Sequence, residues 1–95
     1  MELEERKKIY RHALDKWGND AQMHMVFEEC GELMSALAKV YRNRSTAEDV
    51  LTELADVSIM VEQMATMINY DAYEKEKERK LVRLKERLDG HKDKS

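Results

Sequence analysis

The sequence predicts an all-α fold, an antiparallel four-helix bundle-like protomer that oligomerises through its third helix. The chain contains no proline and only three glycines, and 39% of its residues are charged. Its abundance of Glu, Lys, Leu, Ala and Met favours long helices over sheet. Apolar residues also recur at spacings of three and four, as in amphipathic helices. With 95 residues, we expect a single domain over residues 1–90 and a disordered tail over residues 91–95.

Clusters of turn-forming residues divide the chain into four helical segments. The clusters are Gly18-Asn19-Asp20, Asn43-Arg44-Ser45-Thr46 and Asn69-Tyr70-Asp71. Each cluster also supplies a capping residue for the next helix. The predicted caps are Asp20, Ser45 with Glu48, and Asp71 with Glu74. Because the connections are short, sequential helices should be antiparallel neighbours.

Each segment has an apolar stripe that can pack against its neighbours. The first stripe consists of Leu3, Tyr10, Ala13, Leu14 and Trp17, and the second of Val26, Phe27, Cys30, Leu33, Met34, Leu37, Ala38 and Tyr41. The third consists of Val50, Leu54, Val57, Val61, Met64 and Ile68, and the fourth of Tyr73, Leu81, Leu84 and Leu88.

The third segment is apolar on more than one side. Ile59, Met60 and Met67 point away from its main stripe, so the helix is apolar nearly all round between Leu54 and Ile68. A helix of this kind is buried on several sides, and a four-segment chain has little else to cover it. The sequence therefore predicts a homo-oligomer, because large exposed apolar patches are unfavourable in water.

The composition argues against several classes of partner. A net charge of −3 offers no electrostatic surface for nonspecific binding to nucleic acid or membranes. The longest apolar-rich stretch, residues 54–68, is too short to span a bilayer. The charged N-terminus does not resemble a signal peptide, and the single cysteine, Cys30, cannot form an internal disulfide. We predict a soluble, cytoplasmic protein without a nucleic-acid or membrane partner.

Two pairs of acids lie on the second and third segments. The pairs are Glu29 with Glu32 and Glu53 with Asp56. A spacing of three places both members on one helical face, beside the apolar stripe. On antiparallel helices the pairs should lie at similar heights, so that four carboxylates could face one another across a groove.

Such a group of carboxylates favours a hard cation. Unpaired carboxylates in a partly buried groove repel one another and are costly to desolvate. Magnesium prefers oxygen ligands, retains several waters and binds substrate phosphates. A chain this rich in charge also places Glu-x-x-Glu pairs on ordinary solvated faces, so spacing alone leaves both interpretations open.

The acidic residues carry a family resemblance. Glu28-Glu29-x-x-Glu32, followed about twenty residues later by Glu53-x-x-Asp56, resembles the signature of the MazG-like all-α nucleoside triphosphate pyrophosphohydrolases. The resemblance extends roughly from residue 10 to residue 88. It implies that Glu29, Glu32, Glu53 and Asp56 bind Mg²⁺, for which Mn²⁺ can substitute. It also implies that Glu28 supports these ligands and that Glu28 or Glu29 orients the attacking water.

The resemblance further implies an activity and an assembly. Members of the family hydrolyse a nucleoside triphosphate between the α- and β-phosphates, releasing a nucleoside monophosphate and pyrophosphate. They form dimers, or tetramers built from dimers. Lys80, and with it Arg83 and Arg87, would lie near the triphosphate. Gln22 and Trp17 are candidates for contacts with the base, although Trp17 could instead pack the first helix onto the bundle and Lys80 could lie on a solvated face.

Two other functions remain open at this point. One is a non-catalytic helical oligomerisation or regulatory module whose acidic groove is vestigial. The other is a related pyrophosphatase that acts on a phosphoribosyl nucleotide intermediate. Because the chain has no glycine-rich phosphate loop, phosphate binding in either enzyme must rest on metal and basic side chains.

Overall fold

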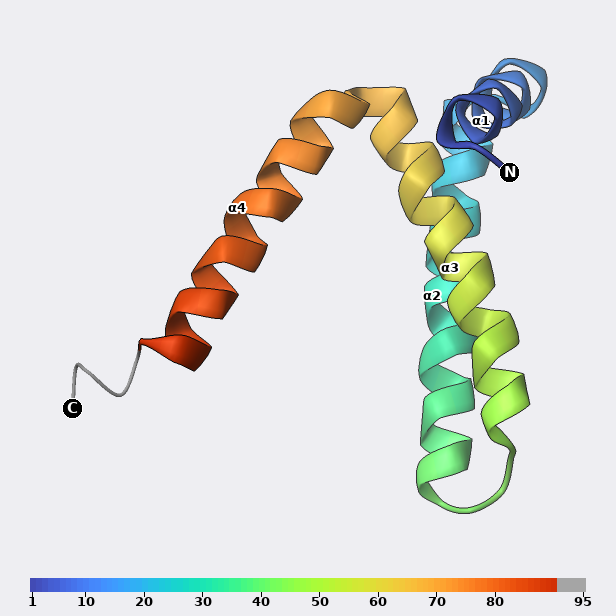
Figure 1. Ribbon diagram of the computed structural model, residues 1–95. Helices are drawn as coiled ribbons and strands as arrows, with labels where there is room; N and C mark the ends of the chain where they lie inside the picture. Colours follow the sequence, from blue (N-terminus) through green and yellow to red (C-terminus); the bar gives the residue numbers. More distant parts are fainter. Residues whose placement is uncertain (91–95) are drawn as a thin grey trace.

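The computed structural model describes residues 1–90 and contains four α-helices (Figure 1). They are α1 (Leu3–Trp17), α2 (Asn19–Tyr41), α3 (Ala47–Ile68) and α4 (Tyr70–Asp89). No strand occurs within these 90 residues, so the all-α prediction is confirmed. Residues 91–95, for which a tail was predicted, lie outside the described part of the chain. No helix over residues 1–90 is both long and apolar enough to cross a bilayer.

The helix breaks fall within the three predicted clusters. Gly18 alone separates α1 from α2 and has φ +91°. This backbone conformation strains residues that carry a Cβ atom, so glycine is the residue that fits there. Asn43, in the turn between α2 and α3, has φ 59°, a left-handed conformation that asparagine tolerates better than most residues.

The capping residues differ from the predicted ones by one or two positions. Thr46 and Asp49 form the capping box of α3, in place of Ser45 and Glu48. The side chain of Asn69 caps α4 by accepting a hydrogen bond of 3.0 Å from the backbone N–H of Ala72, so Asp71 is not the cap. Gly18 precedes α2 without a side-chain cap, which also corrects the assignment of Asp20. Adjacent residues of similar capping chemistry explain these errors.

Helices α2 and α3 form a long antiparallel hairpin, and α1 crosses one end of it (Figure 1). Ala36 of α2 and Met60 of α3 are buried, as are two glutamines, Gln22 and Gln63. The Gln63 Nε2 group donates a hydrogen bond to Gln22 Oε1. Burial of an amide is unfavourable unless it is hydrogen-bonded, and each glutamine supplies this partner for the other.

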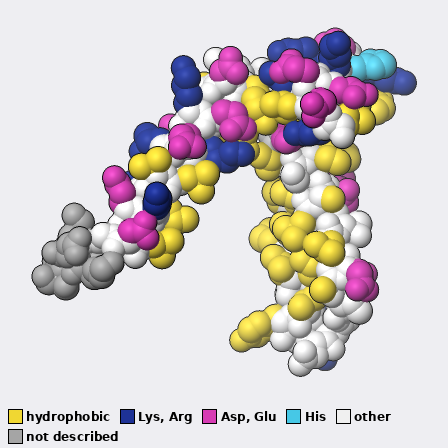
Figure 2. Space-filling model, in the orientation of Figure 1, with side chains coloured by type: hydrophobic (Ala, Val, Ile, Leu, Met, Phe, Trp, Pro, Cys, Tyr) yellow, Lys and Arg dark blue, Asp and Glu magenta, His cyan; other side chains and the backbone are white. Residues whose placement is uncertain are grey.

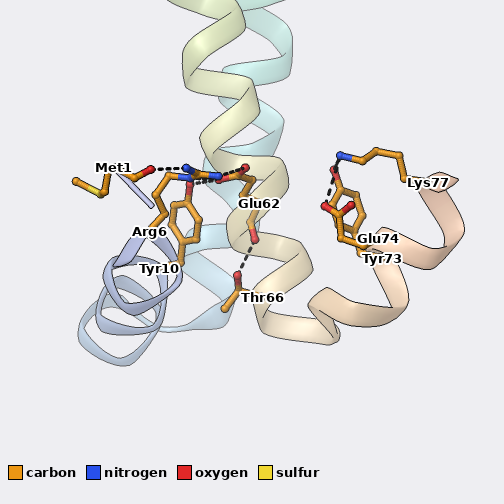
Figure 3. A network of polar contacts seen from close by, with 8 residues as sticks. All are labelled: Met1, Arg6, Tyr10, Glu62, Thr66, Tyr73, Glu74 and Lys77. Atoms are coloured by element: carbon orange, nitrogen blue, oxygen red, sulfur yellow. Dashed lines mark hydrogen bonds and ion pairs between the residues drawn. The ribbon is translucent and has the colours of Figure 1, made fainter. Parts of the chain in front are cut away.

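A network of hydrogen bonds connects α1 to α3 (Figure 3). Arg6 Nε and Nη2 donate to the two carboxylate oxygens of Glu62, over 2.9 and 3.2 Å, and the Tyr10 hydroxyl donates to Glu62 Oε1. The hydrogen bond from Arg6 is the main cause of a Glu62 pKa below its ordinary value. Burial, followed by the contact with Glu62, raises the pKa of Tyr10 to about 12. Glu62 is thus held as a carboxylate by partners within the chain.

Helix α4 runs away from the hairpin at a wide angle (Figure 1). Its first residue, Tyr70, is buried, whereas residues 74–89 are all exposed. The antiparallel neighbours expected from the short connections are therefore seen in α2 and α3, while α4 touches the other helices only around its first turns. The core is correspondingly small, and no side chain in the described residues is less than 2% exposed.

Candidate functional site

Three of the four predicted acids meet between α2 and α3. Glu29 of α2 and Glu53 and Asp56 of α3 each place one carboxylate oxygen within 4.8 Å of the others. We call these three residues the acidic triad. Glu32 does not belong to it: its side chain is exposed, although with Glu53 it lines an adjoining cleft. The predicted convergence of acids across the hairpin is therefore present, with three carboxylates at its centre.

One oxygen of the triad lacks a partner. Glu53 Oε2 is buried and accepts no hydrogen bond, and it is the one buried side-chain nitrogen or oxygen in residues 1–90 of which this is true. Buried polar atoms are hydrogen-bonded in the great majority of cases, and a charged one is particularly costly to leave unmatched. This oxygen is therefore suited to a cation or a proton donor that approaches from outside the chain.

The triad is electrostatically unfavourable by itself. Partial burial raises the pKa of Glu53 above its ordinary value, and the negative charges of Glu32 and Asp56 raise it further. The pKa of Glu29 is raised as well, first by burial, then by the charges of Glu32 and Asp56, by a hydrogen bond with Asp56 and by the charge of Glu53. None of the ion pairs formed within the described residues involves a triad residue. A cation bound among these carboxylates would relieve both the repulsion and the unmatched oxygen.

A polar cleft of about 380 Å³ adjoins the triad at the end of the hairpin that carries the α2–α3 turn. Its lining residues are Glu32, Ser35, Ala36, Lys39, Ser45, Asp49, Thr52 and Glu53. The cleft is thus lined by acidic residues, by hydroxyl groups and by one basic side chain, that of Lys39. Lys39 is not among the site residues predicted from the sequence. Its spacing of seven residues from Glu32, two helical turns along the same face, was the available signal.

The other predicted site residues lie away from the triad within one chain. Glu28 is exposed on α2, next to Glu29 but outside the triad. Gln22 is buried against Gln63, about two helical turns from Glu29. Trp17 is exposed at the end of α1, where Lys16 Nζ lies 5.6 Å from the centre of its ring.

The predicted phosphate-binding residues are on α4. Lys80, Arg83 and Arg87 are all exposed, and Lys80 and Arg87 line a shallow groove along α4 itself. Because α4 diverges from the hairpin (Figure 1), one chain does not bring these residues into the cleft beside the triad. Lys39 is the basic side chain that the hairpin itself supplies there.

Comparisons with protein families, with curated proteins and with solved structures found no match to this chain.

Proposed function

We propose that this protein is a magnesium-dependent hydrolase that cleaves nucleoside triphosphates at the α–β phosphoanhydride, as the resemblance to the MazG-like family implies. The unmatched buried oxygen of Glu53, within a triad of converging carboxylates, is the observation that carries the proposal. Carboxylate oxygens on two rigid helices suit a hard divalent cation, and Mg²⁺ is the cation that most often accompanies nucleotide phosphates.

Glu29, Glu53 and Asp56 would hold the Mg²⁺, for which Mn²⁺ can substitute, and Glu32 would add negative charge beside them. When bound, the ion would neutralise phosphate charge and bring substrate oxygens toward the triad. The reaction consumes one water and yields the nucleoside monophosphate and pyrophosphate.

The chain's own residues have separate tasks in this scheme. Glu29, whose carboxylate lies in the triad, can orient an attacking water and accept its proton. Glu28, exposed beside it, can help to orient that water. In the cleft, the Lys39 ammonium group would bind phosphate oxygens, and the Ser35 hydroxyl group would donate a hydrogen bond to one of them. This arrangement supplies cationic phosphate contacts without a glycine-rich loop.

The deciding experiment is an incubation with a panel of nucleotides and Mg²⁺, followed by identification of the products. Equal amounts of monophosphate and pyrophosphate are expected from at least one nucleoside triphosphate, whether standard or modified. Glu53→Gln and Asp56→Asn should each abolish turnover, whereas Glu48→Gln should retain it, because Glu48 is exposed at the start of the same helix and outside the triad. Orthophosphate as the product, or full activity in both triad variants, would overturn the proposal.

The same panel separates the proposal from its two alternatives. A phosphoribosyl nucleotide, included as a substrate, would reveal a pyrophosphatase of that intermediate if it alone is hydrolysed. A non-catalytic helical module would hydrolyse none of the nucleotides in the panel and would not bind Mg²⁺ at its triad. We place the enzyme in the cytoplasm, where nucleoside triphosphates are made and used.

Substitution of Lys39 tests the phosphate contact. Lys39→Met should raise KM about tenfold, the loss expected for one hydrogen bond to a charged group, and Lys39→Arg should recover part of the affinity. Steady-state kinetics across nucleotide concentrations would measure both. An unchanged KM in Lys39→Met would remove this residue from the site.

A further inference from the structure

The polar cleft runs along the hairpin from the acidic triad to the α2–α3 turn. At one end it is lined by Glu53, a member of the triad, and at the turn end by Ser45 and Asp49. Asp49 precedes Glu53 by four residues, which is about 6 Å along the axis of α3. The two ends of the cleft therefore lie about one helical turn apart and can contact different parts of one ligand.

The cleft is the polar part of the hairpin near its turn. Figure 2 shows apolar side chains along the side of the hairpin that faces the open angle between the hairpin and α4. Apolar side chains give no hydrogen bonds to a ligand that is rich in hydroxyl groups. The cleft, in contrast, combines a carboxylate, a hydroxyl group and an ammonium group at its turn end, from Asp49, Ser45 and Lys39.

The Asp49 carboxylate is held in place by the turn. The Ser45 hydroxyl and the backbone N–H of Thr46 both donate to Asp49 Oδ2, the N–H over 3.4 Å. The contact with Thr46 is half of the capping box of α3. Because both bonds end on Oδ2, Oδ1 is left for a further donor in the cleft. A side chain that the fold already fixes loses little conformational freedom when it binds a ligand.

The charge of Asp49 limits what this end of the cleft can bind. The Ser45 hydrogen bond is the main cause of an Asp49 pKa below its ordinary value, and Thr46 and the positive charge of Lys39 contribute further. The side chain is therefore a carboxylate at neutral pH. A fixed carboxylate repels phosphate oxygens, but it accepts strong hydrogen bonds from hydroxyl groups. The turn end thus suits the sugar of a nucleotide better than a further phosphate.

This preference sets the direction of the nucleotide in the cleft. With its α–β phosphoanhydride at the triad, a nucleoside triphosphate can direct either its outer phosphate or its nucleoside toward the turn. Repulsion by Asp49 disfavours the outer phosphate, so the ribose lies at the turn end. Lys39 remains available to phosphate, because Ser35 lies one turn nearer the triad on α2 and the lysine stem is long and flexible.

We propose that Asp49 binds the ribose of the substrate and makes the enzyme prefer ribonucleotides over 2′-deoxyribonucleotides. Asp49 Oδ1 accepts a hydrogen bond from the 2′-hydroxyl group, as acidic residues do in dinucleotide-binding sites. The Ser45 hydroxyl, whose proton is directed to Asp49, accepts a hydrogen bond from the 3′-hydroxyl group. The assignment of the sugar rests on the proposed function, because hydrolysis at the triad fixes the position of the phosphates. Neither residue belongs to the acidic motif that carries the family resemblance.

Binding of uncleavable nucleotides tests the assignment. The probes are α,β-methylene triphosphates of adenine, guanine, cytosine and uracil, each with ribose and with 2′-deoxyribose, titrated calorimetrically into the full chain with Mg²⁺. For every base that binds, the ribose form should bind at least about tenfold more tightly, the contribution of one hydrogen bond to a charged group. Equal affinities for the two sugars in the wild type would overturn the assignment.

Two variants locate the preference on α3. Asp49→Asn keeps an acceptor for the helix cap but loses the charge, so the ratio of the two affinities should fall about fivefold. A change in phosphate attraction affects both sugars alike and cancels in this ratio. Glu48→Gln removes the neighbouring exposed charge, which lies outside the cleft, and should keep the wild-type ratio. An unchanged ratio in Asp49→Asn would exclude Asp49 as the sugar contact.

A modified sugar keeps the assignment testable if Asp49→Asn fails to fold. A 2′-fluoro group accepts hydrogen bonds but cannot donate one, so the 2′-fluoro analogue should bind the wild type as weakly as the 2′-deoxy form. Binding as tight as that of the ribose form would show that no acceptor reads the 2′-hydroxyl proton, and would overturn the assignment.

Failure of the sugar assignment and failure of the proposed function would be distinguishable. If nucleoside triphosphates are hydrolysed to monophosphate and pyrophosphate while the two sugars bind equally, the proposed function stands and Asp49 is not a specificity residue. If the analogues bind with the expected ratio but no nucleotide is hydrolysed, the cleft is a ribonucleotide site without the proposed reaction. Absence of binding by every analogue would overturn both.

Discussion

Helix α3 carries two glutamates whose surroundings differ sharply. Glu62 accepts hydrogen bonds from Arg6 and Tyr10, and its pKa lies below the ordinary value. Glu53, nine residues earlier, has no ion-pair partner among the described residues and has one buried oxygen without a donor. Its pKa lies above the ordinary value, through burial and through the charges of Glu32 and Asp56. The same type of side chain thus has partners in the second half of the helix and lacks them in the first half.

The difference separates a carboxylate that holds the fold together from one that is available to a ligand. At Glu62 the chain supplies every partner, so the charge contributes to stability and nothing further is needed. In the acidic triad the chain supplies like charges instead, which lowers stability unless a cation or protons bind. Partly buried clusters of carboxylates whose charges have no partner within the chain occur frequently at functional sites.

The largest expected contrast between the two glutamates is in metal affinity. Glu53→Gln should weaken Mg²⁺ binding by at least about tenfold, because one charged ligand of a hard cation becomes neutral. Glu62→Gln should bind Mg²⁺ as the wild type does, since this residue lies in the contact with α1. Isothermal titration calorimetry on both variants would measure the contrast. Equal affinities would mean that the triad is not the metal site.

A smaller contrast is expected in stability without metal. Tyr10→Phe removes a hydroxyl that donates to Glu62 and should lower the free energy of unfolding by about 1–2 kcal/mol. Glu53→Gln should leave the free energy of unfolding unchanged or raise it, because it removes a repelling charge. Urea unfolding in the presence of a chelator, at one fixed protein concentration, would compare the variants. Destabilisation by Glu53→Gln would show that its carboxylate has a structural partner.

The smallest contrast is in the pH dependence of stability. Glu62 has a lowered folded-state pKa, so its contribution is present above the unfolded-state value and is lost as the pH falls through the folded-state pKa. Glu53 has a raised pKa, so its contribution is present below the unfolded-state value and is lost as the pH rises through the folded-state pKa. In metal-free protein, the stability differences between wild type and each glutamine variant should therefore change on opposite sides of pH 4.5, the ordinary value for Glu.

Local sequence patterns predicted the helices and the triad, because both depend on the 3.6-residue period. Glu53 and Asp56 share a face of α3 through their spacing alone, and the antiparallel turn then brings Glu29 opposite them. Glu32 shares the face of Glu29 and lies beside Glu53 at the cleft, but its carboxylate is exposed and is not one of the three that converge.

Structural features that depend on contacts between residues far apart in the sequence could not be predicted from the pattern of a single helix. The partner of Gln22 is 41 residues away, so the burial of this glutamine has no local signal in the sequence. The stripe on α4 identified which side of that helix is apolar, but such a pattern does not specify which molecule covers it. The direction of α4 depends on the corner around Tyr70, where α1 also contributes through Lys7.

The hydrogen-bonded glutamines have a consequence for the register of the hairpin. Gln22 meets Gln63, and seven residues along each antiparallel helix Glu29 meets Asp56. Slippage of α2 against α3 by one turn would separate the two amides inside the interface, where water is not available to replace the lost bond, and would separate the acids as well. The hydrogen bond between these two uncharged side chains, two turns away, therefore helps to fix the helix register that places the carboxylates opposite one another.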